Sequence, residues 1–279
     1  MDLNGKTLVI ATMHLKERAI QPVLEDALGV KCLVVEGLNT DHLGTFTGEK
    51  ERYSDAVTTA RYKCEKAGSL VQGDIYVASE GSFGPHPELL FVPVSEEILF
   101  FTMPSAGIEI VVKHLSMNTN FGHIETTEYS EIQRFANSHQ FPSHKLILST
   151  MSSDGRIFRK DIGNVDELSQ AFHSLQLISP LVRAETDMRA MNNPTRMTEI
   201  KVATEKLVKR IQTCCSVCNS PGFGVTSAIE GLPCGFCGTP TRSINKYKCE
   251  CCRCGHVLFI DPEHNRSFED PMYCQVCNP

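Results

Sequence analysis

The strongest constraint on the fold is a series of cysteine pairs near the end of the chain. Four Cys-x-x-Cys motifs occur in the order Cys215/Cys218, Cys234/Cys237, Cys251/Cys254 and Cys274/Cys277. Intervals of 15, 13 and 19 residues separate them, and eleven of the thirteen cysteines lie in the last 66 residues. This distribution predicts a cysteine-rich module over residues 213–279, following an N-terminal domain over residues 1–212.

The spacing of these motifs indicates zinc. A Cys-x-x-Cys turn directs two thiolates toward one point, and two such turns complete a tetrahedral zinc site. The eight cysteines therefore predict two structural zinc ions. Glycine or asparagine follows the pairs at Asn219, Gly238, Gly255 and Asn278, as expected for turns with positive φ.

The pairing of the motifs is open at this stage. The simplest arrangement joins neighbours, first with second and third with fourth, as in tandem zinc ribbons. A cross-braced arrangement, first with third, is the alternative. Cys214, Cys249 and Cys252 are then spare thiols or alternative ligands. The module either replaces a hydrophobic core that it is too small to build, or offers a docking surface for a protein or nucleic-acid partner.

Composition excludes several classes of protein. The 279-residue chain carries a net charge of −6, which gives no general reason to expect nucleic-acid binding. It contains no apolar stretch near the ~20 residues of a membrane span, and its N-terminus lacks the features of a signal peptide. We expect a cytoplasmic protein that does not enter membranes. The sequence leaves the oligomeric state open, with a homodimer as one alternative.

The first hundred residues read as an α/β fold. Segments 7–12, 31–35 and 73–79 have the apolar and β-branched composition of buried strands. Segment 16–28 has helical spacing and ends at Gly29, and segment 54–68 begins with a serine or aspartate cap. This alternation predicts a partly parallel sheet, and residues 99–115 read as a β-hairpin.

Polar residues follow two of the predicted strands. Thr12, His14 and Lys16 come after the first strand, and Glu80 follows the third in a loop rich in glycine, serine and proline. Ligands of open α/β sheets bind beyond the carboxyl ends of the strands. We therefore expect Glu80 and Lys16 to line one site, where His14 is either a ligand or base or an inert loop residue.

Three further segments are candidates for ligand binding. In residues 44–50, Thr47 and Glu49 either cradle a phosphate or form an ordinary turn. Residues 114–123 suit a hydrogen-bonded turn or a specificity loop, through Ser116, Asn118, Thr119 and Asn120. Residues 184–200 hold Asp187, Arg189 and Arg196 before a predicted helix that reaches about Ile211, and arginine can bind phosphate or carboxylate bidentately.

Parts of the chain resemble known families. ATMHLKERAIQPVLEDALGV resembles the opening of inosine/xanthosine triphosphatases and their Maf-like relatives, with Thr12 and Lys16 at the spacing of a Thr-Asn-Pro-x-Lys turn. SDAVTTARYKCEKA and DIYVASEGSFG resemble later motifs of that superfamily at Ala60, Arg61, Lys63 and Glu80. The whole chain is still more similar to bacterial proteins grouped under a domain-of-unknown-function label, which carry a C-terminal cysteine-rich zinc ribbon.

The triphosphatase resemblance implies an ITPase-like mixed sheet flanked by helices and a nucleotide or related phosphate compound as substrate. It implies Mg²⁺ bound by Glu80, with Lys16 and His14 as further catalytic residues. Thr12, Arg61 and Lys63 would hold phosphates while water attacks to release pyrophosphate. Met13 and His14 stand where the superfamily has Asn-Pro. We therefore expect a Mg²⁺-dependent hydrolase, and the alternative is a non-enzymatic ligand-binding domain coupled to a zinc-ribbon interaction module.

Overall fold

The structure of the protein is a computed structural model that describes residues 2–35, 55–86, 89–263 and 265–279. The candidates Thr47 and Glu49 lie outside these residues. The chain divides into two compact units. One comprises Leu3–Thr102 and Val111–Lys206, and the other comprises Met1–Asp2, Met103–Ile110 and Leu207–Pro279. Among the described residues, no helix has the length and apolar composition needed to cross a membrane.

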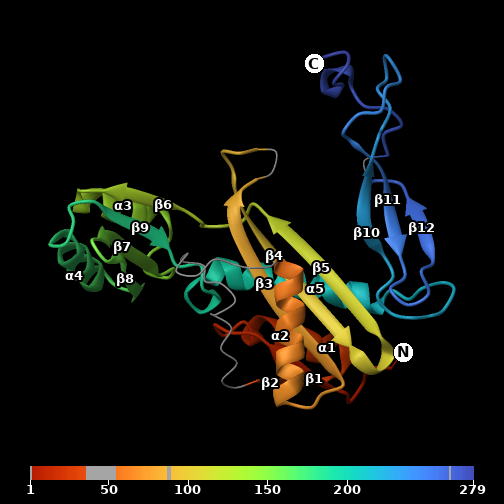
Figure 1. Cartoon of the computed structure of the whole chain (residues 1–279), viewed down its shortest axis with the longest axis horizontal. Helices are drawn as coiled ribbons and strands as arrows, with labels where there is room; N and C mark the ends of the chain where they lie inside the picture. The colour runs from red at the N-terminus through yellow and green to blue at the C-terminus, as the bar shows by residue number, and fades with distance from the viewer. Residues whose placement is uncertain (1, 36–54, 87–88, 264) are drawn as a thin grey trace. The chain divides into compact units, whose positions relative to one another are not determined.

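A five-stranded mixed sheet forms the centre of the first half of the chain (Figure 1). Its strands are β1 (Thr7–Ala11), β2 (Lys31–Val34), β3 (Ile75–Pro85), β4 (Pro93–Met103) and β5 (Ile108–Ser116), in the order β2-β1-β3-β4-β5. β1 pairs in parallel with β2 and β3, whereas β3 and β4 are antiparallel. The predicted mixed α/β fold is confirmed, as is the hairpin now seen as β4 and β5.

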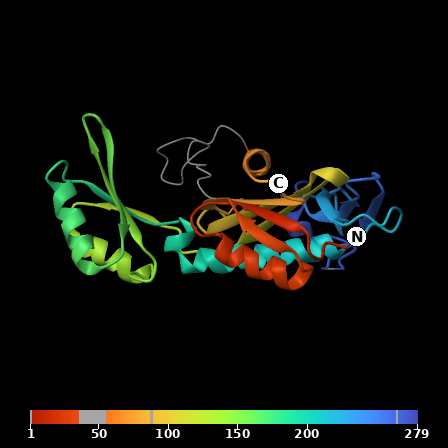
Figure 2. The same cartoon turned by 90° about the horizontal axis from the view of Figure 1, so that it is seen from below.

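Helices cover both faces of this sheet. α2 (Ala56–Leu70) lies on one side, and α1 (Glu17–Leu28) and α5 (Pro194–Gln212) lie on the other (Figure 2). The predicted ends are confirmed, because Gly29 ends α1 in the left-handed region at φ 64° and Asp55 caps α2 by accepting hydrogen bonds from Val57 and Thr58 N–H. Under α2, a buried cluster joins Ala60 and Cys64 to Tyr76 and Ala78 of β3.

The third strand differs from the prediction. β3 runs to Pro85 instead of ending near residue 79, so Glu80 lies inside a strand and not in a following loop. The cause is β4, which pairs with β3 from Tyr76↔Thr102 to Pro85↔Pro93 and so supplies hydrogen bonds along the whole segment. β1 ends earlier, with Ala11 opposite Ala78. Glu80 therefore still lies beyond the carboxyl end of β1.

Residues 123–186 form a second sheet that the sequence analysis did not anticipate. The four antiparallel strands β6 (His123–Thr126), β7 (Leu146–Ser152), β8 (Gly155–Ile162) and β9 (Val182–Thr186) lie in the order β6-β9-β7-β8. α3 (Tyr129–Ser138) and α4 (Val165–Gln176) bury Ile132, Phe135 and Phe172 with strand residues that include Leu148 and Val182. This apolar contact gives the second sheet its own core.

The remaining elements belong to the cysteine-rich region and to short turns. β10 (Val225–Glu230), β11 (Ile244–Glu250) and β12 (Val257–Ile260) form an antiparallel sheet in that order. Three 3₁₀ turns, η2 (Pro104–Ala106), η3 (Ala190–Asn192) and η4 (Pro271–Tyr273), complete the elements among the described residues.

Candidate functional site

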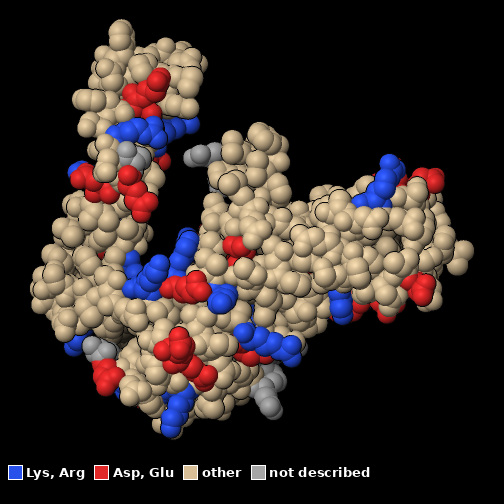
Figure 3. Space-filling view, turned by 180° about the vertical axis from the view of Figure 1, so that it is seen from behind, with Lys and Arg blue, Asp and Glu red and all other residues tan. Residues whose placement is uncertain are grey.

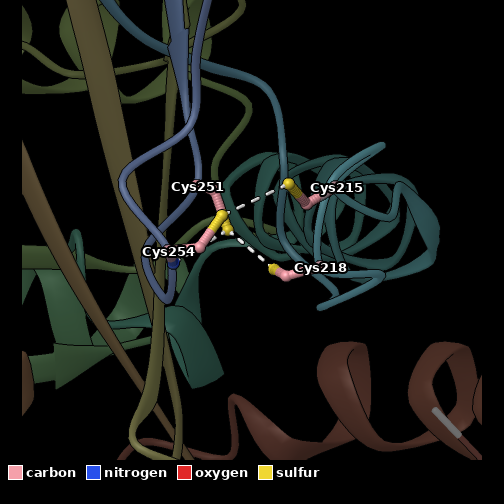
Figure 4. A group of neighbouring side chains, drawn as sticks. All are labelled: Cys215, Cys218, Cys251 and Cys254. Carbon is pink, nitrogen blue, oxygen red and sulfur yellow. Dashed lines mark hydrogen bonds between the residues drawn. The ribbon is translucent and has the colours of Figure 1, made fainter.

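The eight motif cysteines gather into two groups of four. Cys215, Cys218, Cys251 and Cys254 form one group, and Cys234, Cys237, Cys274 and Cys277 form the other. In the first, the sulfur atoms of Cys215 and Cys254 are 3.7 Å apart and those of Cys218 and Cys251 are 3.5 Å apart (Figure 4). Zn–S bonds of ~2.3 Å in a tetrahedron put sulfur atoms roughly 3.8 Å apart. Both groups therefore fit a structural zinc ion.

The four motifs share one turn geometry. The residue after each motif donates its backbone N–H to the carbonyl of the first cysteine, as Asn219 does to Cys215 at 2.9 Å and Gly238 does to Cys234 at 2.9 Å. Asn219, Gly238 and Gly255 adopt positive φ, as predicted, whereas the same prediction is wrong for Asn278. Backbone N–H groups also reach sulfur, for example from Phe236 to Cys234 Sγ at 3.4 Å. Such donors stabilise thiolates that bind a metal.

Of the two arrangements that the sequence left open, the simpler pairing of neighbouring motifs is wrong, because the structure joins the first motif with the third and the second with the fourth. The antiparallel sheet explains this result. Each of β10, β11 and β12 lies between two successive motifs, and each strand runs antiparallel to the one before it. Successive motifs therefore alternate between the two ends of the sheet, and the cross-braced alternative is the one found.

The three spare cysteines lie outside both groups. Cys214 and Cys252 are exposed, and Cys249 is buried on β11. None of the thirteen cysteines, all of which lie in the described part of the chain, forms a disulfide. Burial raises the pKa of the Cys249 thiol, which keeps it protonated and unreactive.

A second candidate site is a group of buried charged side chains around β3 and β4. Lys63 of α2 forms an ion pair with Glu80 of β3, and Arg196 of α5 forms one with Glu97 of β4, with Nε 2.6 Å from Oε1. Lys16 lies within the electrostatic reach of all four of these side chains. We call these five residues the charge cluster. Each is at most 7% exposed, which is unusual for charged side chains.

The two ion pairs lie on opposite faces of the sheet. Glu80 follows Tyr76 and Ala78 in the alternation along β3, so it projects toward α2 and meets Lys63 there. Glu97 lies opposite Gly81 in the β3–β4 register and projects toward α5, where it meets Arg196. The cluster therefore depends on both helices as well as on the strands between them.

Lys16 completes the cluster at the end of β1. Because β1 stops before β3 does, the side of β3 beyond Ala78 is open to other groups, and Lys16 Nζ donates to the carbonyl of Ser79 at 3.4 Å. Among the described residues, no carboxylate lies within ion-pair distance of Lys16. Burial, followed by the charge of Arg196, lowers the pKa of Lys16 from 10.5 to about 7.

Three buried hydroxyl groups accompany the charges. Thr12 follows β1, Ser79 lies on β3, and Ser95 lies on β4 two residues before Glu97. By strand alternation, Ser79 and Ser95 share the sheet face of Glu97. None of the three hydroxyls has a hydrogen-bond partner in the described part of the chain. Buried hydroxyls usually have a hydrogen-bond partner, so these three O–H groups are unusual in being able to donate to a ligand.

Gly81 allows the close approach of the Arg196–Glu97 pair to the sheet. A Cβ at this position would lie 2.7 Å from Glu97 Oε1 and closer still to Arg196 Nη2. Gly84, on the same strand, has open space where its Cβ would be. The glycine at position 81 is therefore a requirement of the charge cluster, not of the strand.

The other predicted site residues lie elsewhere. His14 sits half-buried in the loop after β1 with φ 64°, and Arg61 lies with its guanidinium 5.1 Å from the centre of the Phe100 ring. Asp187 is fully buried and accepts hydrogen bonds from Arg189 and from Asn192 Nδ2 at 2.7 Å. Asp187 and Arg189 therefore anchor the start of α5 together. Of the predicted residues, the structure brings Lys16, Lys63, Glu80 and Arg196 into one cluster.

Sequence reasoning missed Glu97. The signal that could have revealed it is its register, since Glu97, Leu99, Phe101 and Met103 alternate along one face of a strand whose other members are core residues. A carboxylate in a core register requires a buried partner. Here that partner is Arg196.

On one face of the molecule, the charged side chains of the described residues do not gather into a comparable site. On the face shown in Figure 3, basic and acidic side chains are interspersed and leave no large patch of one sign. This arrangement agrees with the modest net charge of −6.

The zinc pairing can be tested by counting metal. Elemental analysis of the purified chain should find about two zinc equivalents. The double variant Cys215→Ala/Cys251→Ala disables one site and should keep about one equivalent, whereas Cys215→Ala/Cys234→Ala disables both and should keep none. Pairing of neighbouring motifs predicts the opposite result for the two variants.

Gly81 provides a test of the packing around the Arg196–Glu97 pair. We expect Gly81→Ala to lower the free energy of unfolding by about 1–3 kcal/mol through overpacking. The matched change Gly84→Ala should alter it by less than about 0.5 kcal/mol, because its Cβ meets nothing. Urea denaturation measures both, and equal effects of the two changes would refute the predicted close approach.

Comparison with known proteins identifies the family of the chain. No curated protein matches the chain. The profile described as "Domain of unknown function (DUF6671)" matches residues 63–279, which include Lys63, Glu80, Glu97, Arg196 and all eight motif cysteines. The resemblance to inosine/xanthosine triphosphatases stays a prediction. The match spans most of the chain, and the protein therefore belongs to the DUF6671 family.

Proposed function

We propose that the α/β domain binds a phosphate-bearing small molecule, such as a nucleotide, at the charge cluster. The observation that carries this proposal is an imbalance of buried charge among the described residues of the cluster. Lys16, Lys63 and Arg196 are three basic groups, and Glu80 and Glu97 are two acidic ones. Each carboxylate already has its own partner, and Lys16 is the additional cation.

An anion would relieve this imbalance. A buried cation without a counter-charge is expensive, and the lowered pKa of Lys16 reports that cost. A phosphate oxygen beside Nζ would favour the charged ammonium and supply the missing negative charge. Strongly shifted pKa values with a defined electrostatic cause are typical of functional sites.

The hydroxyl groups support the same ligand. Thr12, Ser79 and Ser95 each have an O–H donor that lacks a described partner. Phosphate oxygens accept several hydrogen bonds at once, so hydroxyls and an ammonium group suit them together. Ser79 contributes twice, since its carbonyl also orients Lys16.

The donor set does not fit Mg²⁺ as a resident ion. Mg²⁺ prefers several oxygen ligands, and carboxylates bind it best when they are not neutralised by other cations. Here Glu80 is paired with Lys63 and Glu97 with Arg196, and Lys16 adds further positive charge. Among the described residues, the groups able to hold a metal ion are the two sets of cysteines. The proposed binding therefore involves no resident Mg²⁺.

The cysteine-rich module supports a role outside the ligand site. Closed sites of four thiolates have no open position for substrate, so their zinc ions would be structural. Residues 213–279 contain five basic and six acidic side chains, a balance that does not favour a nucleic-acid partner. We propose that any partner of this module is a protein.

Hydrolysis of the bound compound is the second candidate. One observation favours it, because a lysine with a pKa of about 7 can exchange a proton near neutral pH. In this hypothesis water attacks a phosphorus atom of the substrate and loses a proton, while Lys16 in its ammonium form donates a proton to the leaving pyrophosphate. A Mg²⁺ requirement would then mean that the ion arrives with the phosphates of the substrate.

Anion binding is tested by titrating inorganic pyrophosphate into the purified protein in a calorimeter. We expect Lys16→Met to weaken binding by at least about tenfold, because it removes the buried cation that the anion would neutralise. The control is Lys31→Met, an exposed lysine on β2, which should bind as the wild type does. Equal affinity in all three proteins, or no binding by the wild type, would contradict the proposal.

The same variants predict a dependence of stability on pH. The folded pKa of Lys16 is about 7 and the unfolded value is 10.5, so the unfolded chain holds the extra proton between these values. The free-energy cost of burying the charged Lys16 side chain is therefore fully present below about pH 7, and it disappears as the pH rises toward 10.5. Lys16→Met should therefore stabilise the protein at pH 6, by up to about 5 kcal/mol, and much less at pH 10.

Chemical denaturation at the two pH values measures this difference. Lys31→Met should show no such trend, because its side chain is exposed. A stabilisation by Lys16→Met that is the same at both values would mean that Lys16 has its ordinary pKa.

Turnover separates the two candidate functions. Canonical and deaminated nucleoside triphosphates are offered with and without Mg²⁺, and release of pyrophosphate is measured. The hydrolytic hypothesis predicts turnover that Lys16→Met reduces at least about a hundredfold while Lys31→Met does not. Binding without turnover supports the non-enzymatic function alone.

A further inference from the structure

The segment between β5 and β6 holds a buried amide with an unused donor. Asn120 is 8% exposed, and its Oδ1 accepts a hydrogen bond from Asn193 Nδ2 at 2.8 Å. Its own Nδ2 has no hydrogen-bond partner among the described residues. An unsatisfied amide donor at this depth costs free energy, which a ligand acceptor would recover.

The orientation of this amide is fixed by its neighbours. The backbone N–H of Arg196 donates to Asn193 Oδ1 at 2.9 Å, so Nδ2 of Asn193 must be the atom that faces Asn120. Asn120 must then present Oδ1 to that donor, which leaves its Nδ2 as the unused group. These contacts link Asn120 through Asn193 to the backbone of Arg196 in the charge cluster.

Two aromatic rings belong to residues that adjoin Asn120 in the chain or contact Arg196. Phe121 follows Asn120 and stacks on Phe83 of β3, with ring centroids 5.9 Å apart and planes inclined by 29°. The guanidinium of Arg196 lies 5.0 Å from the centre of the Phe83 ring. Both phenylalanines are half-buried and keep part of their surface exposed. The aromatic pair and the amide are therefore both linked to Arg196 of the charge cluster, the pair through Phe83 and the amide through Asn193.

We infer that Asn120, Phe83 and Phe121 form a subsite for a planar heteroaromatic base on the ligand whose phosphate the charge cluster binds. The base stacks against the phenylalanine rings, and Asn120 Nδ2 donates to a ring nitrogen or carbonyl at its edge. This inference rests on the proposed phosphate binding and narrows its ligand to nucleotides. It also assigns residues 118–121 as a specificity loop.

The test compares ligands that share a phosphate but differ in the base. Ribose 5-phosphate and the four ribonucleoside 5′-monophosphates are titrated separately into the full chain. At least one nucleotide should bind about tenfold or more tightly than ribose 5-phosphate, as base stacking and one hydrogen bond predict. Affinities within twofold of one another for all five compounds would overturn the subsite.

Two variants locate the effect. Phe121→Leu removes a ring and keeps an apolar side chain, and Asn120→Asp keeps the acceptor for Asn193 while it removes the amide donor. Each should reduce the ratio of nucleotide to ribose 5-phosphate affinity by about fivefold or more. The control is Phe158→Leu on β8. This change also removes a half-buried ring that contacts a basic side chain, Lys160, and it should leave the ratio unchanged.

The ratio separates failure of this inference from failure of the proposed function. If ribose 5-phosphate and pyrophosphate bind through Lys16 but the ratio is near one, the phosphate site exists and the base subsite does not. If none of the compounds binds, the proposed function itself fails. Thermal melting of each variant shows whether it is folded, and Phe121→Leu carries the test if Asn120→Asp is not.

Discussion

The candidate site depends on the burial of five charged side chains where β3 extends past the end of β1. Removing one member of a buried ion pair costs about 3–5 kcal/mol, so Lys63–Glu80 and Arg196–Glu97 restrain α2 and α5 against opposite faces of one sheet. Lys16 adds a charge that this arrangement does not neutralise. Replacing such a cluster with apolar residues would often stabilise a fold, which is why its presence indicates a function.

Much of the local structure could be predicted from the sequence. The periodicity of segments 16–28 and 54–68, the stop at Gly29 and the cap at Asp55 specify helices by local chemistry. The extent of β3 could not be predicted in the same way, because glycine, serine and proline at 79–85 favour a loop until β4 pairs with them. The role of Glu97 could not be predicted for a related reason, because its partner Arg196 is 99 residues away in the chain.

The cysteine motifs show the same division between local and non-local information. Their spacing is sufficient to identify eight metal ligands, but the partners of each pair depend on the strands between them. An interval of 13 residues or more accommodates one strand and its turns. Because β10, β11 and β12 run alternately up and down the sheet, the first and third motifs lie at one end of it and the second and fourth at the other.

The most direct measurement is an NMR titration of the Lys16 side chain in the full-length protein, with Lys16→Met to assign the signal. Without ligand, the pKa of Lys16 should be about 7. Added pyrophosphate should raise it toward the ordinary value, because the anion stabilises the ammonium form. A pKa near 10.5 in the free protein, or one that pyrophosphate leaves unchanged, would contradict the assignment of the charge cluster as an anion site.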